Sequence, residues 1–547
     1  MQDILMKRRM MRQLLWIFAL TRGYRWKMVG YISLDILTLL LGLAFVYESK
    51  HAVDIVTGSA AGSLRLIILL IVSSVALGIL TGQWSAWISE RMKVRMTVAL
   101  QDTLVDSQMR AVWESTKRWH TGDLLFRLNT DVAEVVQMIV ITFPSLFVTG
   151  IRMTASWLLL WMMDSVLAWM ILAISPLFLF SKIYYRRMRK LSRETKEMES
   201  NLGIVLQENL RQRLLIRALG MDEARQEKYR EVQEAIKLRK YNLLQFDFFA
   251  RMLLKYAFNG GYLLAFVWGI YRLHTGLVTF GTLTAFLQLV SRIQGPVLTA
   301  IAFVPAAIRC RTAVERLITM NEEECEVREP AVSVGSLQAV ELRDVTFGYE
   351  DRKVIERLSA TLRPGFPTAI VGTTGKGKTT LIRLMLALVR PEKGRLFLQT
   401  DTAEIPVTVG TRGYFSYVPQ GNTLFSGTIR ENLLLAAPRA SEEEMADALA
   451  LACAGFVDSL PEGMDTVIGE SGYGLSEGQA QRIAIARALL HQGKIWLFDE
   501  ATSALDRNTS ERLVRNLLRI GQDKILIFVT HDSRLTDACS QVIRLDE

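Results

Sequence analysis

The sequence predicts two domains of different fold class: an all-α domain with six membrane-spanning helices in residues 1–320, and an α/β domain in residues 326–547. Apolar residues gather in runs of about 20 or more in the first part of the chain, the length a helix needs to cross a bilayer. The later part alternates short apolar strands with glycine-rich turns and amphipathic helices, as soluble α/β domains do. A chain of 547 residues is also too long for a single hydrophobic core.

The all-α domain begins with a basic, polar stretch and a short apolar patch, which predict an interfacial helix at about 12–26 rather than a cleaved signal. The polar stretches 90–131 and 182–246 are rich in Lys and Arg, whereas the short connections contain few. By the positive-inside rule, we expect a multi-pass protein of the cell membrane with the long loops, both termini and the α/β domain in the cytosol. The six predicted spans are about 28–48, 64–88, 132–161, 165–188, 247–272 and 280–308.

The net charge of +10 is largely explained by this topology, so the composition does not favour nucleic-acid binding. The four cysteines are scattered and lack the spacing of metal ligands. They suit a reducing cytosol and predict no disulfide.

The α/β domain contains a glycine-rich turn, GTTGKGKTT, between the expected strand TAIV and the expected helix LIRLMLAL. This turn satisfies the phosphate-binding pattern G-x-x-x-x-G-K-[ST]. In that pattern the backbone amides surround the phosphates, Lys378 reaches the β and γ oxygens, and the Thr379 hydroxyl holds Mg²⁺. We expect the whole turn to bind ATP: Gly372, Thr373, Thr374, Gly375, Lys376, Gly377, Lys378, Thr379 and Thr380.

An acidic pair ends the apolar run KIWLFDE further along the chain. A parallel strand beside the phosphate-binding turn would place Asp499 near Mg²⁺ and Glu500 near an attacking water, as phosphoryl transfer requires. A solvated turn is the alternative, but the neighbouring SALD, which ends at Asp506, and the later His531 favour the catalytic interpretation.

Taken in order over nearly the whole chain, these motifs resemble those of ATP-binding cassette (ABC) exporter half-transporters. The resemblance implies that Tyr349 stacks on adenine, that Gln420 senses Mg²⁺ and the membrane domain, and that LSEGQ is the family signature. It also implies that Glu500 polarises the water, His531 contacts the γ-phosphate and Lys378 stabilises charge. The nucleotide contacts outside the glycine-rich turn would be Tyr349, Gln420, Ser476, Gly478, Gln479 and Asp506, and the Mg²⁺ ligands Thr379, Gln420 and Asp499.

The two long loops also resemble those of the family. Residues 118–135 and 206–229 would each carry a short coupling helix that docks on a nucleotide-binding domain. Solvated extensions of the membrane helices are the alternative.

The signature departs from the family norm, LSGGQ, because its third position is Glu477. In the family, two nucleotide domains face head to tail and each signature closes on ATP held by the other. A carboxylate about 4 Å from a phosphate repels it by roughly 1 kcal/mol in water, but the amides and dipole of the following helix would remain. The preferred hypothesis is a homodimer that tolerates Glu477. The alternative is the catalytic half of a heterodimer whose partner carries the consensus signature.

The mechanism that the resemblance implies is ATP-driven export by alternating access. Three ionisable residues, Asp35, Arg152 and Arg292, lie near mid-membrane, where an ionisable side chain facing lipid is costly. They predict a polar cavity for a hydrophobic, amphipathic or anionic substrate such as a lipid, a peptide or a drug-like molecule. Alternatively, Asp35 pairs with an arginine and fixes helix packing. An ABC-type gated channel or an importer are the other functions that this architecture allows.

Overall fold

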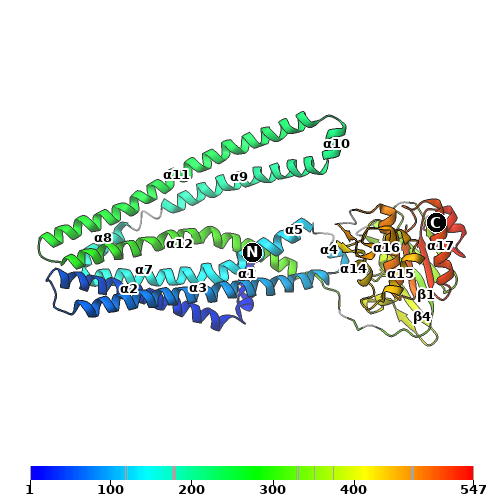
Figure 1. The fold of residues 1–547 in the computed structure, drawn as a ribbon, viewed down its shortest axis with the longest axis horizontal. Helices are drawn as coiled ribbons and strands as arrows, with labels where there is room; N and C mark the ends of the chain where they lie inside the picture. Colours follow the sequence, from blue (N-terminus) through cyan, green and yellow to red (C-terminus); the bar gives the residue numbers. More distant parts are fainter. Residues whose placement is uncertain are drawn as a thin grey trace. The chain divides into compact units, whose positions relative to one another are not determined.

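The computed structural model describes residues 2–116, 119, 121–174, 180–327, 329–330, 332–349, 352–373, 375–469 and 474–545. The chain forms two compact units, shown as a ribbon in Figure 1. The membrane unit comprises Met1–Asp106 and His120–Glu322, and the nucleotide unit comprises Ser107–Trp119 and Glu323–Glu547. The sequence had placed residues 107–119 in the membrane domain, whereas the structure groups them with the nucleotide unit.

The membrane unit is built from helices. Three stretches, 25–56, 64–109 and 122–163, are long and apolar enough to cross a membrane, as judged over the described residues. The predicted span 165–188 includes residues 175–179, which lie outside the described residues. The helices are α1 (Gln2–Thr21), α2 (Arg25–Val56), α3 (Leu64–Met109), α5 (Thr121–Phe126), α6 (Val132–Gln137), α7 (Phe143–Met163), α8 (Ser165–Ile174), α9 (Phe180–Arg211), α10 (Arg213–Ala218), α11 (Asp222–His274) and α12 (Phe280–Asn321).

Several helices extend beyond the predicted spans, and two expectations differ in more than length. The interfacial helix was expected at 12–26, but α1 ends at Thr21 and a turn follows, in which the Tyr24 amide donates to the Thr21 carbonyl at 2.9 Å. The span expected at 132–161 is part of a longer helical stretch, in which π turns at Arg127–Asp131 and Met138–Thr142 connect α5, α6 and α7. Hydrophobic periodicity does not predict such single turns.

Helices α9 and α11 lie side by side and are joined at one end by α10 (Figure 1). Ion pairs connect them along their length, Arg239 with Glu194 at 3.3 Å and Lys240 with Glu199 at 2.6 Å. The polar stretch between the predicted fourth and fifth spans is therefore a helical hairpin.

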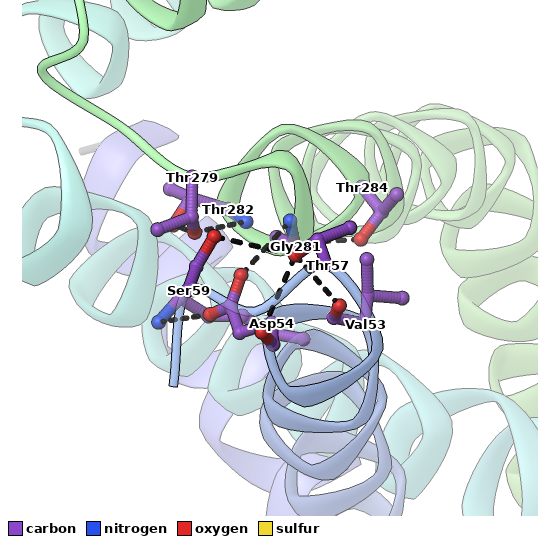
Figure 2. Close-up of polar contacts among 9 residues, drawn as sticks. Val53, Asp54, Thr57, Ser59, Thr279, Gly281, Thr282 and Thr284 are labelled. Carbon is purple, nitrogen blue, oxygen red and sulfur yellow. Dashed lines mark hydrogen bonds and ion pairs between the residues drawn. The ribbon is translucent and has the colours of Figure 1, made fainter. Parts of the chain in front are cut away.

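The end of α2 is fixed to the start of α12 through a buried carboxylate (Figure 2). The Asp54 Oδ1 atom accepts from the Gly281 amide at 3.1 Å, and Thr279 caps the same helix by accepting from the Thr282 amide at 3.2 Å. A Cβ at position 281 would collide with Asp54 and with the Lys50 carbonyl, so this joint requires glycine.

The nucleotide unit contains a five-stranded parallel sheet in the order β11-β3-β10-β9-β6, a four-stranded antiparallel sheet in the order β2-β1-β4-β5, and the pair β7-β8. Strands β9 and β10 are buried along their whole length, as expected for central parallel strands. The strands are β1 (Leu337–Tyr349), β2 (Arg352–Leu362), β3 (Thr368–Val371), β4 (Lys393–Thr400), β5 (Glu404–Pro406), β6 (Phe415–Val418), β7 (Gly427–Thr428), β8 (Val467–Ile468), β9 (Ile495–Asp499), β10 (Ile525–Val529) and β11 (Gln541–Arg544).

The nucleotide unit also contains helices (Figure 1). They are α4 (Trp113–Thr116), α13 (Lys378–Met385), α14 (Ile429–Leu434), α15 (Glu442–Leu451), α16 (Glu477–Leu490), α17 (Arg507–Ile520) and α18 (Ser533–Asp537). Helix α4 precedes the stretch 118–135 in which the first coupling helix was expected.

Candidate nucleotide-binding site

The glycine-rich turn leaves β3 and opens α13 without a side-chain cap. Gly375 and Gly377 have φ angles of 87° and 95°, a region that favours glycine. A Cβ at Gly377 would come within 2.9 Å of Val354 Cγ1 and 3.1 Å of the Val354 carbonyl. The uncapped amides at the start of α13, together with the helix dipole, suit an anionic ligand.

The side chains of the turn differ in exposure. Lys378 Nζ donates to the Gly372 carbonyl at 2.7 Å, so the ammonium group folds back over the turn. Thr379 is exposed, whereas Thr380 is buried. The predicted contact Thr374 lies outside the described residues.

The register of the parallel sheet brings Asp499 to the same edge as the turn. Val529 of β10 pairs with Ile370 of β3 on one side and with Asp499 of β9 on the other. Strand β10 lies between β9 and the turn-bearing strand β3, an order that the sequence did not predict. The two motifs still meet, because the carboxyl ends of parallel strands share one edge.

The Asp499 carboxyl is 5% exposed, and burial raises its pKa to about 6, with a further increase from the Glu500 charge. A hydrogen bond from Tyr417 and the nearby cations Lys378 and Arg383 act in the opposite direction. A buried carboxyl whose ionised form is penalised in this way gains from a cationic partner. This position therefore fits a Mg²⁺ ligand.

The side chains of two other predicted residues, Gln420 and His531, lie next to the Glu500 carboxylate. Gln420 Nε2 donates to Glu500 Oε2 at 2.7 Å, and His531 Nδ1 lies 3.4 Å from Glu500 Oε1. Glu500 has a φ of 48°, which is uncommon for a residue with a side chain, and its amide donates to the Val529 carbonyl at 2.9 Å. Left-handed backbone of this kind gathers at functional sites, where the surrounding structure holds the residue in place.

The signature turn explains why Glu477 is tolerated within this chain. Ser476 caps α16 through a capping box, accepting from the Gln479 amide at 3.3 Å while its own amide donates to Gln479 Oε1 at 2.9 Å. Glu477 is the first residue of the helix and is exposed. At Gly478, in contrast, a Cβ would lie 2.6 Å from the Ala504 carbonyl. The fourth signature position thus requires glycine, whereas the third has room for a side chain.

Comparison with known proteins identifies the family. The family model described as ABC transporter transmembrane region matches residues 28–297, and that described as ABC transporter matches residues 355–503. An uncharacterised ABC transporter ATP-binding protein, YfiB of Bacillus subtilis, is 30% identical over 406 residues, which are 73% of this chain and 70% of that protein. The chain belongs to the ABC transporter family. It is an ATP-hydrolysing transporter with its membrane and ATPase domains fused in one chain.

Two further comparisons show which other proteins this ABC transporter is similar to. The ATP-dependent lipid A-core flippase of Aromatoleum aromaticum is 27% identical over 508 residues, 88% of this chain and 80% of the flippase. A solved structure of a bacterial Atm1-family ABC exporter with ATP bound superposes with a TM-score of 0.78 at 23% identity, covering 95% of this chain and 93% of that one. The second similarity establishes the fold.

Two further predicted nucleotide contacts of the ABC transporter, Asp506 and Tyr349, form hydrogen bonds within the chain. Asp506 caps α17, where its Oδ1 accepts from the Thr509 amide at 3.0 Å, and hydrogen bonds to this carboxylate lower its pKa. The Tyr349 hydroxyl accepts from Arg383 Nη1 at 2.9 Å. Asp506 therefore shapes the loop after Glu500, and the Tyr349 ring is held from α13.

Sequence reasoning missed three residues at this site. They are Arg383, Tyr417 and Gln481, whose Nε2 donates to the Glu500 carbonyl at 3.0 Å. Each lies in or next to a motif, but none belongs to a pattern that points to chemistry. Only the paired strands and packed helices bring them to the site.

The three ionisable membrane residues lie on α2, α7 and α12. Arg292 of α12 reaches α2, where a Cβ at Gly42 would come within 2.7 Å of its Nη1 atom. Arg152 of α7 is close enough to act on Arg292 electrostatically. Among the described residues, no ion pair joins Asp35 to either arginine. Arg152 and Arg292 thus lie within electrostatic range of each other, and Asp35 forms no ion pair with them in the part of the chain that the structure describes.

Proposed function

We propose that this ABC transporter is an exporter that moves an anionic amphipathic substrate of lipid type across the cytoplasmic membrane, working as a homodimer by alternating access. The observation that carries the proposal is the meeting of Glu500 with Gln420 and His531, at the sheet edge that also holds the phosphate-binding turn. One chain therefore supplies the groups that hydrolysis needs, apart from the signature contributed by a second copy.

The chain's residues divide the hydrolytic work. The amides at the start of α13 and Lys378 hold the phosphates of ATP and neutralise charge that develops on them. Glu500 orients the attacking water, with Gln420 and His531 fixing its carboxylate. Thr379, Gln420 and Asp499 are the residues that would hold Mg²⁺, which supplies further neutralisation of the phosphate oxygens.

A second copy of the chain would complete each site. A hollow of about 500 Å³ lies beside Glu500 and His531 and is also lined by Ser503, Leu505 and Arg534. We place the γ-phosphate and the partner's signature turn against this hollow. Because Glu477 is exposed on its own helix, its carboxylate can turn to solvent while the amides of α16 face the phosphate.

Two exposed apolar surfaces suit coupling between the units. Helix α10 exposes Leu214 by 82% and Leu215 by 51%, at the tip of the α9–α11 hairpin. A groove on the nucleotide unit exposes Phe425 by 63% and Leu435 by 59%. We propose that α10 docks in this groove on the second copy of the chain, because the contact would bury apolar area that both surfaces leave in water.

The substrate class follows from Arg152 and Arg292. Two nearby arginines that form no ion pair with a carboxylate among the described residues favour a ligand that carries negative charge, such as a lipid phosphate. The relatives named as lipid A-core flippases make a lipid the first choice.

The test uses the purified chain in proteoliposomes. We expect phosphatidylglycerol to stimulate ATP hydrolysis more than phosphatidylcholine, and a fluorescent phosphatidylglycerol to cross the bilayer only with ATP and not in Glu500→Gln. In Arg152→Gln/Arg292→Gln, the ratio of stimulated to unstimulated turnover should fall towards one, with Arg65→Gln, at an exposed arginine of α3 in the same unit, as the control. Stimulation that persists in the double variant would remove the anionic-substrate assignment.

A further inference from the structure

Residues 107–119 are fastened to the nucleotide unit by backbone pairing. The Val112 amide donates to the Glu324 carbonyl at 2.8 Å, and the Glu326 amide donates to the Arg110 carbonyl at 2.7 Å. Ala111 and Cys325 form an antiparallel bridge between these two bonds. The short helix α4 is therefore held in place where it emerges from this pairing, and its first residue, Trp113, packs on the core of the unit.

Arg383 connects Trp113 to the proposed adenine-binding residue. Its guanidinium carbon lies 5.4 Å from the centre of the Trp113 ring, within the range of a cation–π interaction. Its Nη1 atom donates to the Tyr349 hydroxyl at 2.9 Å. One half-buried arginine side chain thus joins a loop residue to a residue of the base site.

The orientation of the Tyr349 ring is also restricted by packing. Its ring meets Phe347 edge-on, with centroids 5.0 Å apart and planes at 90°. Packing of this kind fixes the tilt of the ring, while the hydrogen bond from Arg383 fixes its hydroxyl end. The planar guanidinium can satisfy both partners only in a narrow range of positions. A shift of Trp113 would therefore disturb the bond to Tyr349, and a base stacked on Tyr349 would act back on Trp113.

We propose that Arg383 is a positioning residue that orients Tyr349 for the nucleotide base and couples base stacking to Trp113 in the loop that follows α3. This inference rests on the proposed ATPase site. It adds a route by which the state of the base site reaches the residues next to the membrane helices, separate from the route through Gln420 and Glu500.

The first experiment separates base recognition from phosphate binding in the full chain in nanodiscs. In Arg383→Gln, the KM for ATP should rise about 3- to 10-fold with a change of less than twofold in kcat, in line with loss of a charge-assisted hydrogen bond. Inhibition by inorganic tripolyphosphate, which has no base, should change by less than twofold. Tyr349→Phe should raise the KM similarly, and the double variant should be no worse than either single variant.

Arg390→Gln is the matched control, because Arg390 is exposed and lies beyond α13; its KM should stay at the wild-type value. Additive effects of Arg383→Gln and Tyr349→Phe, or equal losses for ATP and tripolyphosphate, would overturn the positioning role. If Arg383→Gln fails to fold, Arg383→Lys, which keeps the charge, takes its place. Additive effects of Arg383→Lys and Tyr349→Phe on the KM for ATP would then overturn the positioning role.

The second experiment tests the connection to the loop. Trp113→Leu should lower phosphatidylglycerol-stimulated turnover several-fold and raise the KM for ATP, whereas Trp113→Phe, which keeps an aromatic face, should stay near wild type. Equal behaviour of the two variants would overturn the coupling. If the wild-type chain shows no Glu500-dependent hydrolysis, the proposed function fails; if it does and the Arg383 variants behave like Arg390→Gln, only this inference fails.

Discussion

Helices α13 and α16 both begin at a glycine-containing turn, but their first turns are satisfied differently. Helix α13 starts at Gly377 with no side-chain cap, whereas α16 starts at Ser476 within a complete capping box. The first helix leaves its amides for a ligand of its own chain. In the second helix a capping box already satisfies the Gln479 amide, and we propose that this turn serves a site on another chain. The difference shows that a similar glycine pattern can begin a helix with or without a side-chain cap, and we propose that the two turns contact phosphate in different ways.

The largest expected effect comes from adding a side chain to the uncapped turn at the start of α13. Gly377→Ala should reduce ATP affinity at least about 100-fold, because the φ of 95° is strained for alanine and the new Cβ would press on Val354. The measurement is binding of a fluorescent ATP analogue by Glu500→Gln protein, in which we expect no turnover. Gly413→Ala, at a glycine with open space around it, should bind normally. Equal affinities would contradict the account of the α13 turn.

The second effect separates the two central positions of the signature. Gly478→Ala should lower turnover about 10- to 100-fold, since its Cβ meets the Ala504 carbonyl at 2.6 Å, while ATP binding by the same chain changes little. Gly455→Ala in the same unit, where no atom lies near the new Cβ, is the control. Normal turnover in Gly478→Ala would show that the signature turn is looser than its packing implies.

A smaller effect is expected from removing the cap of α16. Ser476→Ala loses the hydroxyl that accepts from the Gln479 amide, a change that costs about 1 kcal/mol of helix stability. Turnover should fall a few-fold, and amide exchange in the first turn of α16 should quicken while exchange in α13 stays unchanged. Faster exchange in both helices would mean that the two turns are not independent.

The smallest expected effect is a pH dependence of the Mg²⁺ requirement, which depends on Asp499. Because the pKa of Asp499 is raised to about 6, protons should compete with Mg²⁺ as the pH falls through that value, and the Mg²⁺ concentration needed for half-maximal turnover should be higher at pH 5.5 than at pH 7.5. Tyr417→Phe removes a hydrogen bond that lowers this pKa, so the rise in Mg²⁺ requirement should begin at a higher pH. A pH-independent requirement in both proteins would contradict the assignment of Asp499.

The sequence could point to residues of the proposed nucleotide site because its motifs are local. Lys378, Asp499, Glu500 and Ser476 all lie where a strand meets a turn or a helix begins, and such positions can be read from short patterns. Arg383 and Tyr417 could not be found in that way, since their roles depend on strands and helices far apart in the chain. The interposed β10 escaped prediction for the same reason: strand order is set by tertiary pairing.

The membrane unit was predicted less completely. Hydropathy locates long apolar helices, but it does not record the π turns before α7 or the joint between Asp54 and Gly281. The sequence assigned residues 107–119 to the membrane domain because they fall within the polar stretch 90–131 between two predicted spans. These residues belong to the nucleotide unit because their backbone pairs with Glu324 and Glu326, and sequence periodicity does not predict such pairing.

The central claim is that this chain alone forms competent ATP sites, with Glu477 in its signature. The direct test is ATPase activity of the singly expressed chain in lipid nanodiscs, beside Glu500→Gln and Glu477→Gly. The account predicts clear turnover that is lost in Glu500→Gln and changes less than about threefold in Glu477→Gly, because the exposed carboxylate at the start of α16 can turn away from the phosphates. Near-silence of the lone chain, with activity restored by Glu477→Gly, would contradict it and point to a partner chain that carries the consensus signature.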